Sequence, residues 1–197
     1  MEIDQQRSTN SDKEGSGTHQ HIVNSAGSLG ARNELGTKDA PRPSPVQPVI
    51  KGDDYPYKDS QPDALGGDRW GFYARECTSF VAWRINQLGV HFTNGMSGPK
   101  GNPDRNDPVF GDAGNWANHA KKLGFRVDNK PSVGAIVHYG PNAFLAGPSG
   151  HVAYVAQVNG DGTIVIEEYN WLPFPYGYHN PPRVIRASDV SDFIHIV

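Results

Sequence analysis

The sequence predicts an α+β fold in which helices come first and an antiparallel sheet follows. Apolar residues recur at helical spacing early in the folded region, and five short runs rich in β-branched and aromatic residues come later. A strong hairpin signal, Asn159-Gly160-Asp161-Gly162, lies between two of these runs. Helices followed by hairpin-connected strands are typical of α+β architecture.

The first helix is expected to begin at Cys77 and to end near Gly89, a residue type that favours helix C-termini. Its apolar positions follow the spacing i, i+3, i+4, i+8 and i+11, which defines one helical face. They are Cys77, Phe80, Val81, Ile85 and Leu88. Residues 92–111, rich in Gly, Pro and Asn, read as a long loop.

A second, shorter helix fits residues 115–123, with Gly124 as its stop. The residues expected to face inward are Trp116, Ala120 and Leu123. Strands then dominate the sequence. The expected strands are Val133–Tyr139, His151–Val158, Thr163–Tyr169, Arg183–Arg186 and Phe193–Val197.

Composition narrows the classes of function. The chain has 197 residues, a formal net charge of −3 and one cysteine. A charge so close to zero disfavours a nucleic-acid partner, and one cysteine excludes a disulfide framework or a cysteine-rich zinc module. No apolar run reaches the roughly 18–20 residues that span a bilayer, so we expect no membrane insertion. We also expect a monomer without a cofactor.

The N-terminal part differs from the rest, because every Phe, Trp and Tyr lies at or after Tyr55. Residues 1–52 are polar and end in a Pro-rich stretch, so they cannot bury enough apolar surface to offset the entropy of ordering. We predict a disordered arm at 1–52 and a folded domain at 53–197. The N-terminus has no basic or apolar signal region, so we expect synthesis in the cytoplasm without a classical signal peptide.

The hairpin signal allows a register to be derived. With a loop of two or four residues, Val158 opposes Thr163, and the numbers of paired residues sum to 321. Side chains alternate between the two faces of a sheet. One face then carries His151, Ala153, Val155 and Gln157 from one strand, with Ile164, Ile166, Glu168 and Asn170 from the other. Glu167 points to the opposite face.

This register places His151 beside Glu168 and opposite Asn170 at the end of an apolar face. Such a group is costly unless its members pair, so one interpretation is a satisfied polar cluster. Cys77 alone could be a small buried hydrophobe. Together, however, a Cys at a helix N-terminus, a His and a carboxylate or amide match the nucleophile, base and orienting group of cysteine hydrolases.

Residues 71–84, GFYARECTSFVAWR, resemble the signature helix of CHAP domains, the cysteine- and histidine-dependent amidohydrolases/peptidases. Later blocks of that family are matched in order by residues 131–137, 150–155 and 164–171, and residues 193–196 resemble its closing strand. The resemblance covers about residues 53–197. It implies a papain-like fold and cleavage of a peptidoglycan amide, either the N-acetylmuramoyl-L-alanine bond or a peptide bond of the stem or cross-bridge.

Carried over residue by residue, the resemblance implies that Cys77 is the nucleophile and His151 the base. Glu168 would orient His151, and Asn170 would be a supporting polar group. Five aromatic residues near these motifs could line a groove for substrate, although aromatic residues beside a helix are often core. They are Trp70, Phe72, Tyr73, Trp116 and Trp171.

No metal site is expected. Asp59, Asp63 and Asp68 precede the cysteine helix, but the close Asp-x-Asp spacing of a calcium loop is absent. A zinc site that uses His138 and His151 has no recognisable ligand spacing.

Several biological roles stay open at this point. The chain could be a phage-type lysin or a delivered antibacterial effector that acts in the periplasm, the cell wall or the medium after non-classical release. Residues 1–52 would then bind a delivery component, and an immunity protein would be a further partner. The alternatives are a cytosolic amidase for a small amide conjugate and a catalytically silent wall-binding module.

Overall fold

The computed structural model describes residues 50–61, 67–102, 104–171 and 176–197. The predicted arm at 1–52 lies outside these residues, except for its last three. Within the described ranges the helices and strands are, in chain order, α1 (Cys77–Asn86), α2 (Trp116–Leu123), β1 (Arg126–Asp128), β2 (Ile136–Tyr139), β3 (His151–Val158), β4 (Thr163–Glu167), β5 (Arg183–Arg186) and β6 (Asp192–His195). Single 3-10 turns occur at Ala113–Asn115 and Ala143–Leu145.

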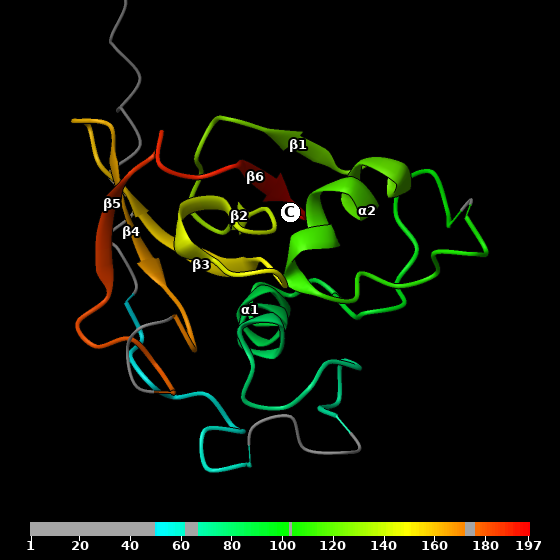
Figure 1. The fold of residues 1–197 in the computed structure, drawn as a ribbon, viewed down its shortest axis with the longest axis horizontal. Helices are drawn as coiled ribbons and strands as arrows, with labels where there is room; N and C mark the ends of the chain where they lie inside the picture. The colour runs from blue at the N-terminus through cyan, green and yellow to red at the C-terminus, as the bar shows by residue number, and fades with distance from the viewer. Residues whose placement is uncertain (1–49, 62–66, 103, 172–175) are drawn as a thin grey trace, which may run out of the picture. The chain divides into compact units, whose positions relative to one another are not determined.

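The strands form one antiparallel sheet in the order β1-β6-β2-β3-β4-β5, which confirms the predicted α+β class (Figure 1). β3 and β5 have the predicted bounds. The strand β1 was not predicted, because three residues are too few to show alternation. β2 begins three residues later than expected, because residues 132–135 form a turn. The turn is closed by a hydrogen bond from the Ala135 N–H to the Ser132 carbonyl.

Helix α1 packs against β3 with residues 79–85 all buried (Figure 1). It ends at Asn86, two residues before the predicted Leu88, whose side chain is 45% exposed. The Asn86 side chain explains the early end. Its Nδ2 donates to the carbonyls of Ala82 and Phe92, and its Oδ1 accepts from the Phe92 N–H, so the chain turns back at this point.

Helix α2 follows the prediction closely. Trp116, Ala120 and Leu123 are fully buried, and Gly124 ends the helix in the left-handed conformation with φ of 89°. Both helices contribute to one hydrophobic cluster, which also contains Val152 of β3. The helices therefore cover the same face of the sheet.

The opposite face of the sheet has its own hydrophobic cluster, built from alternate residues of the central strands. Its members are Ala135, Val137, Tyr139, Ala153, Val155, Ile164, Ile166, Trp171 and Phe193. Side chains after β2 and β5 pack against it, including Ala146 and Val190. Because both faces of the sheet are covered, strand residues that point to either face can be buried.

The β3–β4 hairpin corrects the predicted register near its turn. The turn has three residues rather than two or four: the Asn159 N–H donates to the Thr163 carbonyl at 2.9 Å, and Gly162 has φ of 84°. An odd loop shifts the pairing by one position, so Val158 faces Ile164 and not Thr163.

A bulge at Ala156 then cancels this shift. Beyond it Val155 pairs with Ile166 and Tyr154 with Glu167, which is the predicted register. Gln157, by contrast, pairs with Val165 and so lies on the face opposite to the predicted one. The predicted separation of Glu167 from Glu168 holds, because it depends only on the part of the ladder beyond the bulge.

Glu167 forms a buried ion pair with α1. Its Oε1 lies 2.7 Å from Arg84 Nη2 and accepts the Tyr178 hydroxyl at 2.8 Å. The Arg84 side chain is 2% exposed and that of Glu167 is fully buried. Arg84 also donates to Asp54 and to the Gly52 carbonyl, so the pair ties the start of the described chain to α1 and β4.

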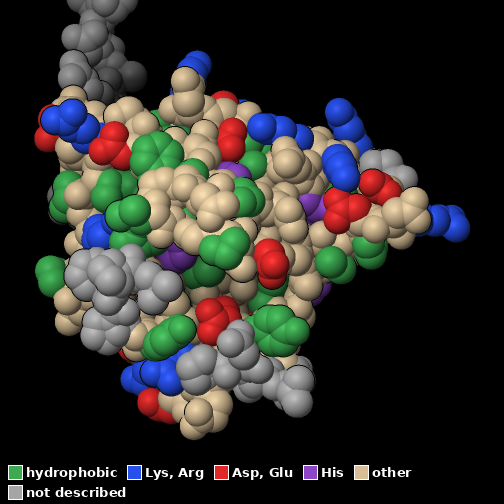
Figure 2. All heavy atoms as spheres, in the orientation of Figure 1, with side chains coloured by type: hydrophobic (Ala, Val, Ile, Leu, Met, Phe, Trp, Pro, Cys, Tyr) green, Lys and Arg blue, Asp and Glu red, His purple; other side chains and the backbone are tan. Residues whose placement is uncertain are grey.

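The surface carries charges of both signs. On the face shown in Figure 2, Lys and Arg side chains are interspersed with Asp and Glu. In the described ranges, no helix has the length and apolar character needed to cross a membrane.

Replacing Arg84 with Met is expected to lower the free energy of unfolding by about 3–5 kcal/mol, because the buried Glu167 carboxylate would lose its counter-charge. Chemical denaturation at neutral pH measures the loss. Arg126→Met is the matched control, since the Arg126 side chain is 56% exposed, and it should cost less than about 1 kcal/mol. Equal losses in both variants would contradict the assigned role of the buried pair.

Candidate active site

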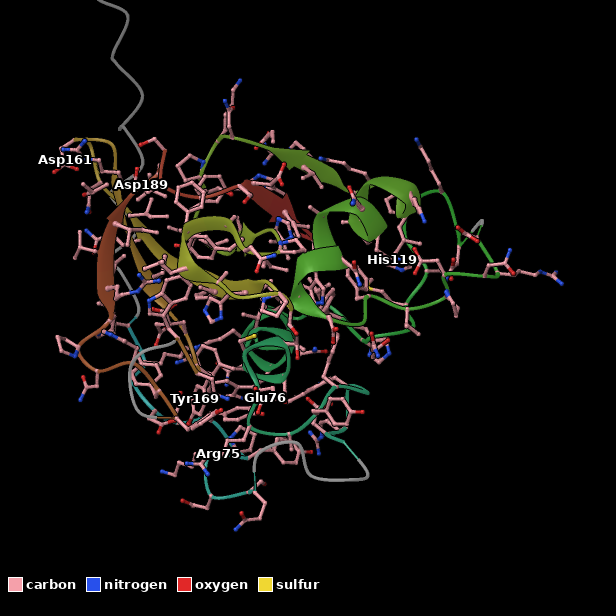
Figure 3. The ribbon with its side chains drawn as sticks, in the orientation of Figure 1. Arg75, Glu76, His119, Asp161, Tyr169 and Asp189 are labelled. Carbon is pink, nitrogen blue, oxygen red and sulfur yellow. The ribbon has the colours of Figure 1, made fainter. Side chains whose placement is uncertain are left out.

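The N-terminus of α1 presents Cys77, which is half-buried and is the free cysteine of the chain. The turn before it is fixed at Arg75, whose φ of 67° is unusual for a residue with a side chain. The Arg75 N–H donates to the Tyr55 hydroxyl at 3.0 Å, and its carbonyl accepts Asn170 Nδ2 at 2.8 Å. Figure 3 shows Arg75, Glu76 and Tyr169 at this same end of α1.

The first turn of α1 is also fixed by a buried hydrogen-bond network around Ser79. The Ser79 hydroxyl donates to Asp68 and bonds with the Tyr55 hydroxyl, and all three residues are buried. Asp68 in turn accepts the N–H groups of Trp70 and Phe72 at 2.8 and 2.9 Å. This network fixes the position from which Cys77 projects.

His151 is the first residue of β3 and is positioned by Gly150. Gly150 has φ of 69°, and a Cβ there would lie 2.5 Å from the Gly114 Cα and 2.6 Å from the Tyr139 carbonyl oxygen. Only glycine fits this close approach. The chain therefore enters β3 at a defined point, and the imidazole is buried against Trp171 at a ring-centroid distance of 4.9 Å.

The His151 ring lies between the thiol and a carboxylate. Its Nε2 donates to Glu168 Oε2 at 2.9 Å, and the ring also interacts with the Cys77 side chain. Burial alone would lower the pKa of His151, but the interactions with Cys77 and Glu168 outweigh it and raise the pKa to about 9. The imidazole is thus held in its cationic form beside the sulfur at neutral pH.

Glu168 is fully buried and is held by Arg183 of β5. Arg183 Nε donates to Glu168 Oε1, and Nη2 donates to Oε2 at 3.0 Å. Burial raises the pKa of Glu168, yet the hydrogen bonds from His151 and Arg183 lower it below its ordinary value overall. The guanidinium also lies 4.2 Å from the Trp171 ring centroid. Glu168 is therefore an ionised carboxylate with both oxygens occupied.

Arg183 was not among the site residues predicted from the sequence. The pairing of Arg183 with Ile166 places it on the face of Glu168, two residues beyond Ile166 on β4. An arginine at the start of an expected strand was the available signal, but the connection after Asn170 gave no way to set the β4–β5 register from the sequence.

Asn170 does not join His151 in the structure, which corrects the predicted register. β4 ends at Glu167, and Asn170 has φ of 58°, so the strand does not continue to the position opposite His151. The Asn170 amide instead donates to the Arg75 carbonyl and to Glu76 Oε2, and its Oδ1 accepts the Gly177 N–H. Asn170 braces the turn before Cys77.

The five predicted groove aromatics occupy different environments. Trp116 is fully buried among Phe72, Phe92 and Phe110, so the structure corrects its proposed contact with substrate: it is core. Trp70, Phe72 and Trp171 are 4–7% exposed, and Tyr73 is 56% exposed. A groove role for these four residues stays a prediction.

No group of three or more His, Cys, Asp or Glu in the described part of the chain is arranged to hold a metal ion. Asp63 lies outside that part, and Asp68 is engaged with Ser79 as described above. His138 bonds with Asp192 and with the Gly114 carbonyl, each at 3.2 Å. It serves the packing of β2 and not a site with His151.

The chain is similar to known proteins in sequence and in fold. The family model for the CHAP domain matches residues 67–170. The probable autolysin SsaALP of Staphylococcus aureus is 46% identical over 125 residues, which are 64% of this chain and 39% of that protein. The staphylococcal secretory antigen ssaA2 of the same species is 40% identical over 92 residues, which are 44% of this chain and 31% of that protein.

Among solved structures, an N-acetylmuramoyl-L-alanine amidase from Staphylococcus aureus superposes with a TM-score of 0.51 and 28% identity. The match covers 73% of this chain and 37% of the amidase chain. The chain thus spans well under half the length of each relative. A helix that presents a cysteine to a histidine on an antiparallel sheet is the arrangement of a papain-like fold. The chain belongs to the CHAP domain family.

Replacing Arg183 with Met is expected to destabilise the protein by about 3 kcal/mol at pH 7 and by much less at pH 3.5. The folded-state pKa of Glu168 is lowered, so its contribution is present above the ordinary carboxyl pKa and is lost as pH falls. Urea unfolding at both pH values measures the difference. Arg186→Met, on the exposed side of the same strand, should change little at either pH; a loss for Arg183→Met that does not depend on pH would contradict the ion-pair assignment.

Proposed function

We propose that the domain hydrolyses an amide or peptide bond of peptidoglycan with Cys77 as nucleophile, His151 as base and acid, and Glu168 as the group that orients His151. The observation that carries the proposal is the line Cys77–His151–Glu168, with the pKa of His151 raised to about 9. Three groups in this order are the arrangement that activates a thiol for acyl transfer.

In the first step the Cys77 thiolate, whose proton is held by His151, attacks the amide carbonyl carbon. The imidazolium is stabilised by the ionised Glu168. The first N–H groups of a helix have no intrahelical acceptor. The Cys77 N–H can therefore donate to the developing oxyanion, an interaction worth about 3–4 kcal/mol in other hydrolases.

In the second step the C–N bond breaks as His151 returns its proton to the leaving amine, and the acyl group stays on the sulfur as a thioester. His151 then takes a proton from water, whose oxygen attacks the thioester carbonyl. The C–S bond breaks, the carboxylic acid product leaves, and the sulfur returns to the thiolate form beside the protonated His151. Asn170 supports this cycle by bracing the turn before Cys77.

Peptidoglycan is proposed as substrate because of the relatives. Two of them are named as an autolysin and an N-acetylmuramoyl-L-alanine amidase. The bond to be tested first is therefore the one between N-acetylmuramic acid and L-alanine, with the peptide bonds of the stem and cross-bridge as the other targets. The name secretory antigen of a further relative supports action outside the cytoplasm. A phage-type lysin and a delivered effector are both routes to the wall, and in either case residues 1–52 would be the recruiting arm.

Digestion of purified peptidoglycan by the wild type is expected to release new fragments, whereas Cys77→Ala should release none, because the variant lacks the nucleophile. Mass spectrometry of the products identifies the bond, since amidase and endopeptidase fragments differ in their end groups. Release of the same fragments by Cys77→Ala would disprove the assigned nucleophile. No fragments from any of several wall types would favour a small amide substrate.

The pH profile of kcat/KM should fall on the basic side near pH 9, where His151 loses the proton of the active ion pair. Replacing Glu168 with Gln removes the negative charge that helps to hold this proton. The basic limb should then move down by at least about one pH unit. Glu167→Gln is the control on the other face of the sheet, and it should leave the limb in place. An unmoved limb in Glu168→Gln would contradict the orienting role.

A further inference from the structure

A surface pocket of about 370 Å³ lies beside the candidate active site. Three separate segments line it: the chain before α1 with Asp53 and Lys58, the turn at Arg75, and the chain after β4 from Tyr169 to Asn180 in its described part. Two of its residues adjoin the site. Arg75 is two positions before Cys77, and Trp171 contacts the His151 ring at its edge.

The charge of this pocket favours an anion. Lys58 and Arg75 contribute two cations, and the Asp53 carboxylate accepts the Tyr169 hydroxyl. Arg75 Nη1 donates to the Ser60 carbonyl at 3.2 Å, which anchors one corner of the guanidinium. Its Nε is buried and has no hydrogen-bond partner among the described residues, so the donors that can reach a ligand are those at the end of the guanidinium. A guanidinium offers five N–H donors in a planar fork, which matches a carboxylate.

The backbone at Arg75 adds a second observation. Its φ of 67° lies in the left-handed region, which a residue with a side chain rarely adopts and where glycine is at ease. The surrounding hydrogen bonds to Tyr55 and Asn170 fix this conformation whatever the side chain. Because the position suits glycine, the presence of arginine indicates that its side chain has a role. Arg75 is itself one of the residues that line the pocket.

Aromatic side chains complete the lining. Tyr169, Trp171, Tyr176 and Tyr178 border the same pocket, so a ligand could place its carboxylate on the cations and its carbon skeleton on the rings. Stem peptides of peptidoglycan have this chemistry, because they carry free carboxylates on short aliphatic residues.

We propose that this pocket is a substrate subsite in which Arg75, assisted by Lys58, binds a free carboxylate of the wall peptide and so selects peptides that carry the acid and not the amide. The proposal rests on the proposed function for its choice of ligand. It assigns the pocket to recognition and leaves the chemistry to Cys77 and His151.

The test uses two synthetic muramyl peptides that differ only in their free carboxylates, which are carboxamides in the second. Calorimetry with the full-length Cys77→Ala protein measures binding without cleavage. The carboxylate peptide should bind roughly 10- to 100-fold more tightly, as expected for hydrogen bonds to a charged group. Adding Arg75→Gly should abolish the difference, and adding Lys58→Met should reduce it.

Glycine is the informative replacement at Arg75, because it removes the guanidinium and accepts the left-handed backbone without strain. The thermal midpoint should therefore stay within a few degrees of the parent. Arg69→Met is the matched control: Arg69 is exposed, lies six residues earlier and does not line this pocket, so the preference should persist.

Equal binding of the two peptides, or no binding of either, would overturn the subsite. A preference that survives in Arg75→Gly would also overturn it. Cleavage by the wild type is measured separately on both peptides. A carboxylate preference in binding without any cleavage would refute the proposed hydrolysis and leave the subsite standing, so the two proposals fail in different ways.

Discussion

The structure depends on two adjacent carboxylates, Glu167 and Glu168, that are buried on opposite faces of the sheet. Each has its own arginine: Arg84 reaches Glu167 from α1, and Arg183 reaches Glu168 from β5. A buried carboxylate without a counter-charge costs several kcal/mol. The alternation of the chain at this point therefore fixes two things at once, the docking of α1 against the sheet and the orientation of His151.

The candidate site is assembled from segments that lie on separate elements of the chain. A helix N-terminus supplies Cys77, a strand start supplies His151, and the end of the next strand supplies Glu168. Asn170 connects the last of these to the first, because it follows Glu168 and bonds to the turn that precedes Cys77. Cys77 and Glu168 are thus held in register by one short stretch of chain.

Periodicity made the helices and the antiparallel sheet predictable, because each pattern lies within one element. The pairing of His151 with Glu168 was predicted from an even turn, and it holds because the three-residue turn and the bulge at Ala156 cancel. The rest depends on single backbone conformations and on long connections. The left-handed φ of Asn170 ends β4 and removes this residue from His151, and no pattern in the sequence announces it. Arg183 was hidden because the chain between β4 and β5 does not reveal their register. Trp116 was predicted to contact substrate because it is an aromatic residue near the motifs, but it lies on the buried face of α2.

The hairpin contains two departures from regularity that offset each other, the three-residue turn and the bulge at Ala156. Lengthening or shortening the turn by one residue would make the bulge unnecessary, and a homologous hairpin with an even turn and a straight strand would present the same carboxylate to His151. A slip of the β3–β4 pairing by one position would exchange the faces of Glu167 and Glu168. Because both positions are glutamate, the histidine would still meet a carboxylate. The doublet thus gives this hairpin a tolerance to a one-residue slip of register that one glutamate could not provide.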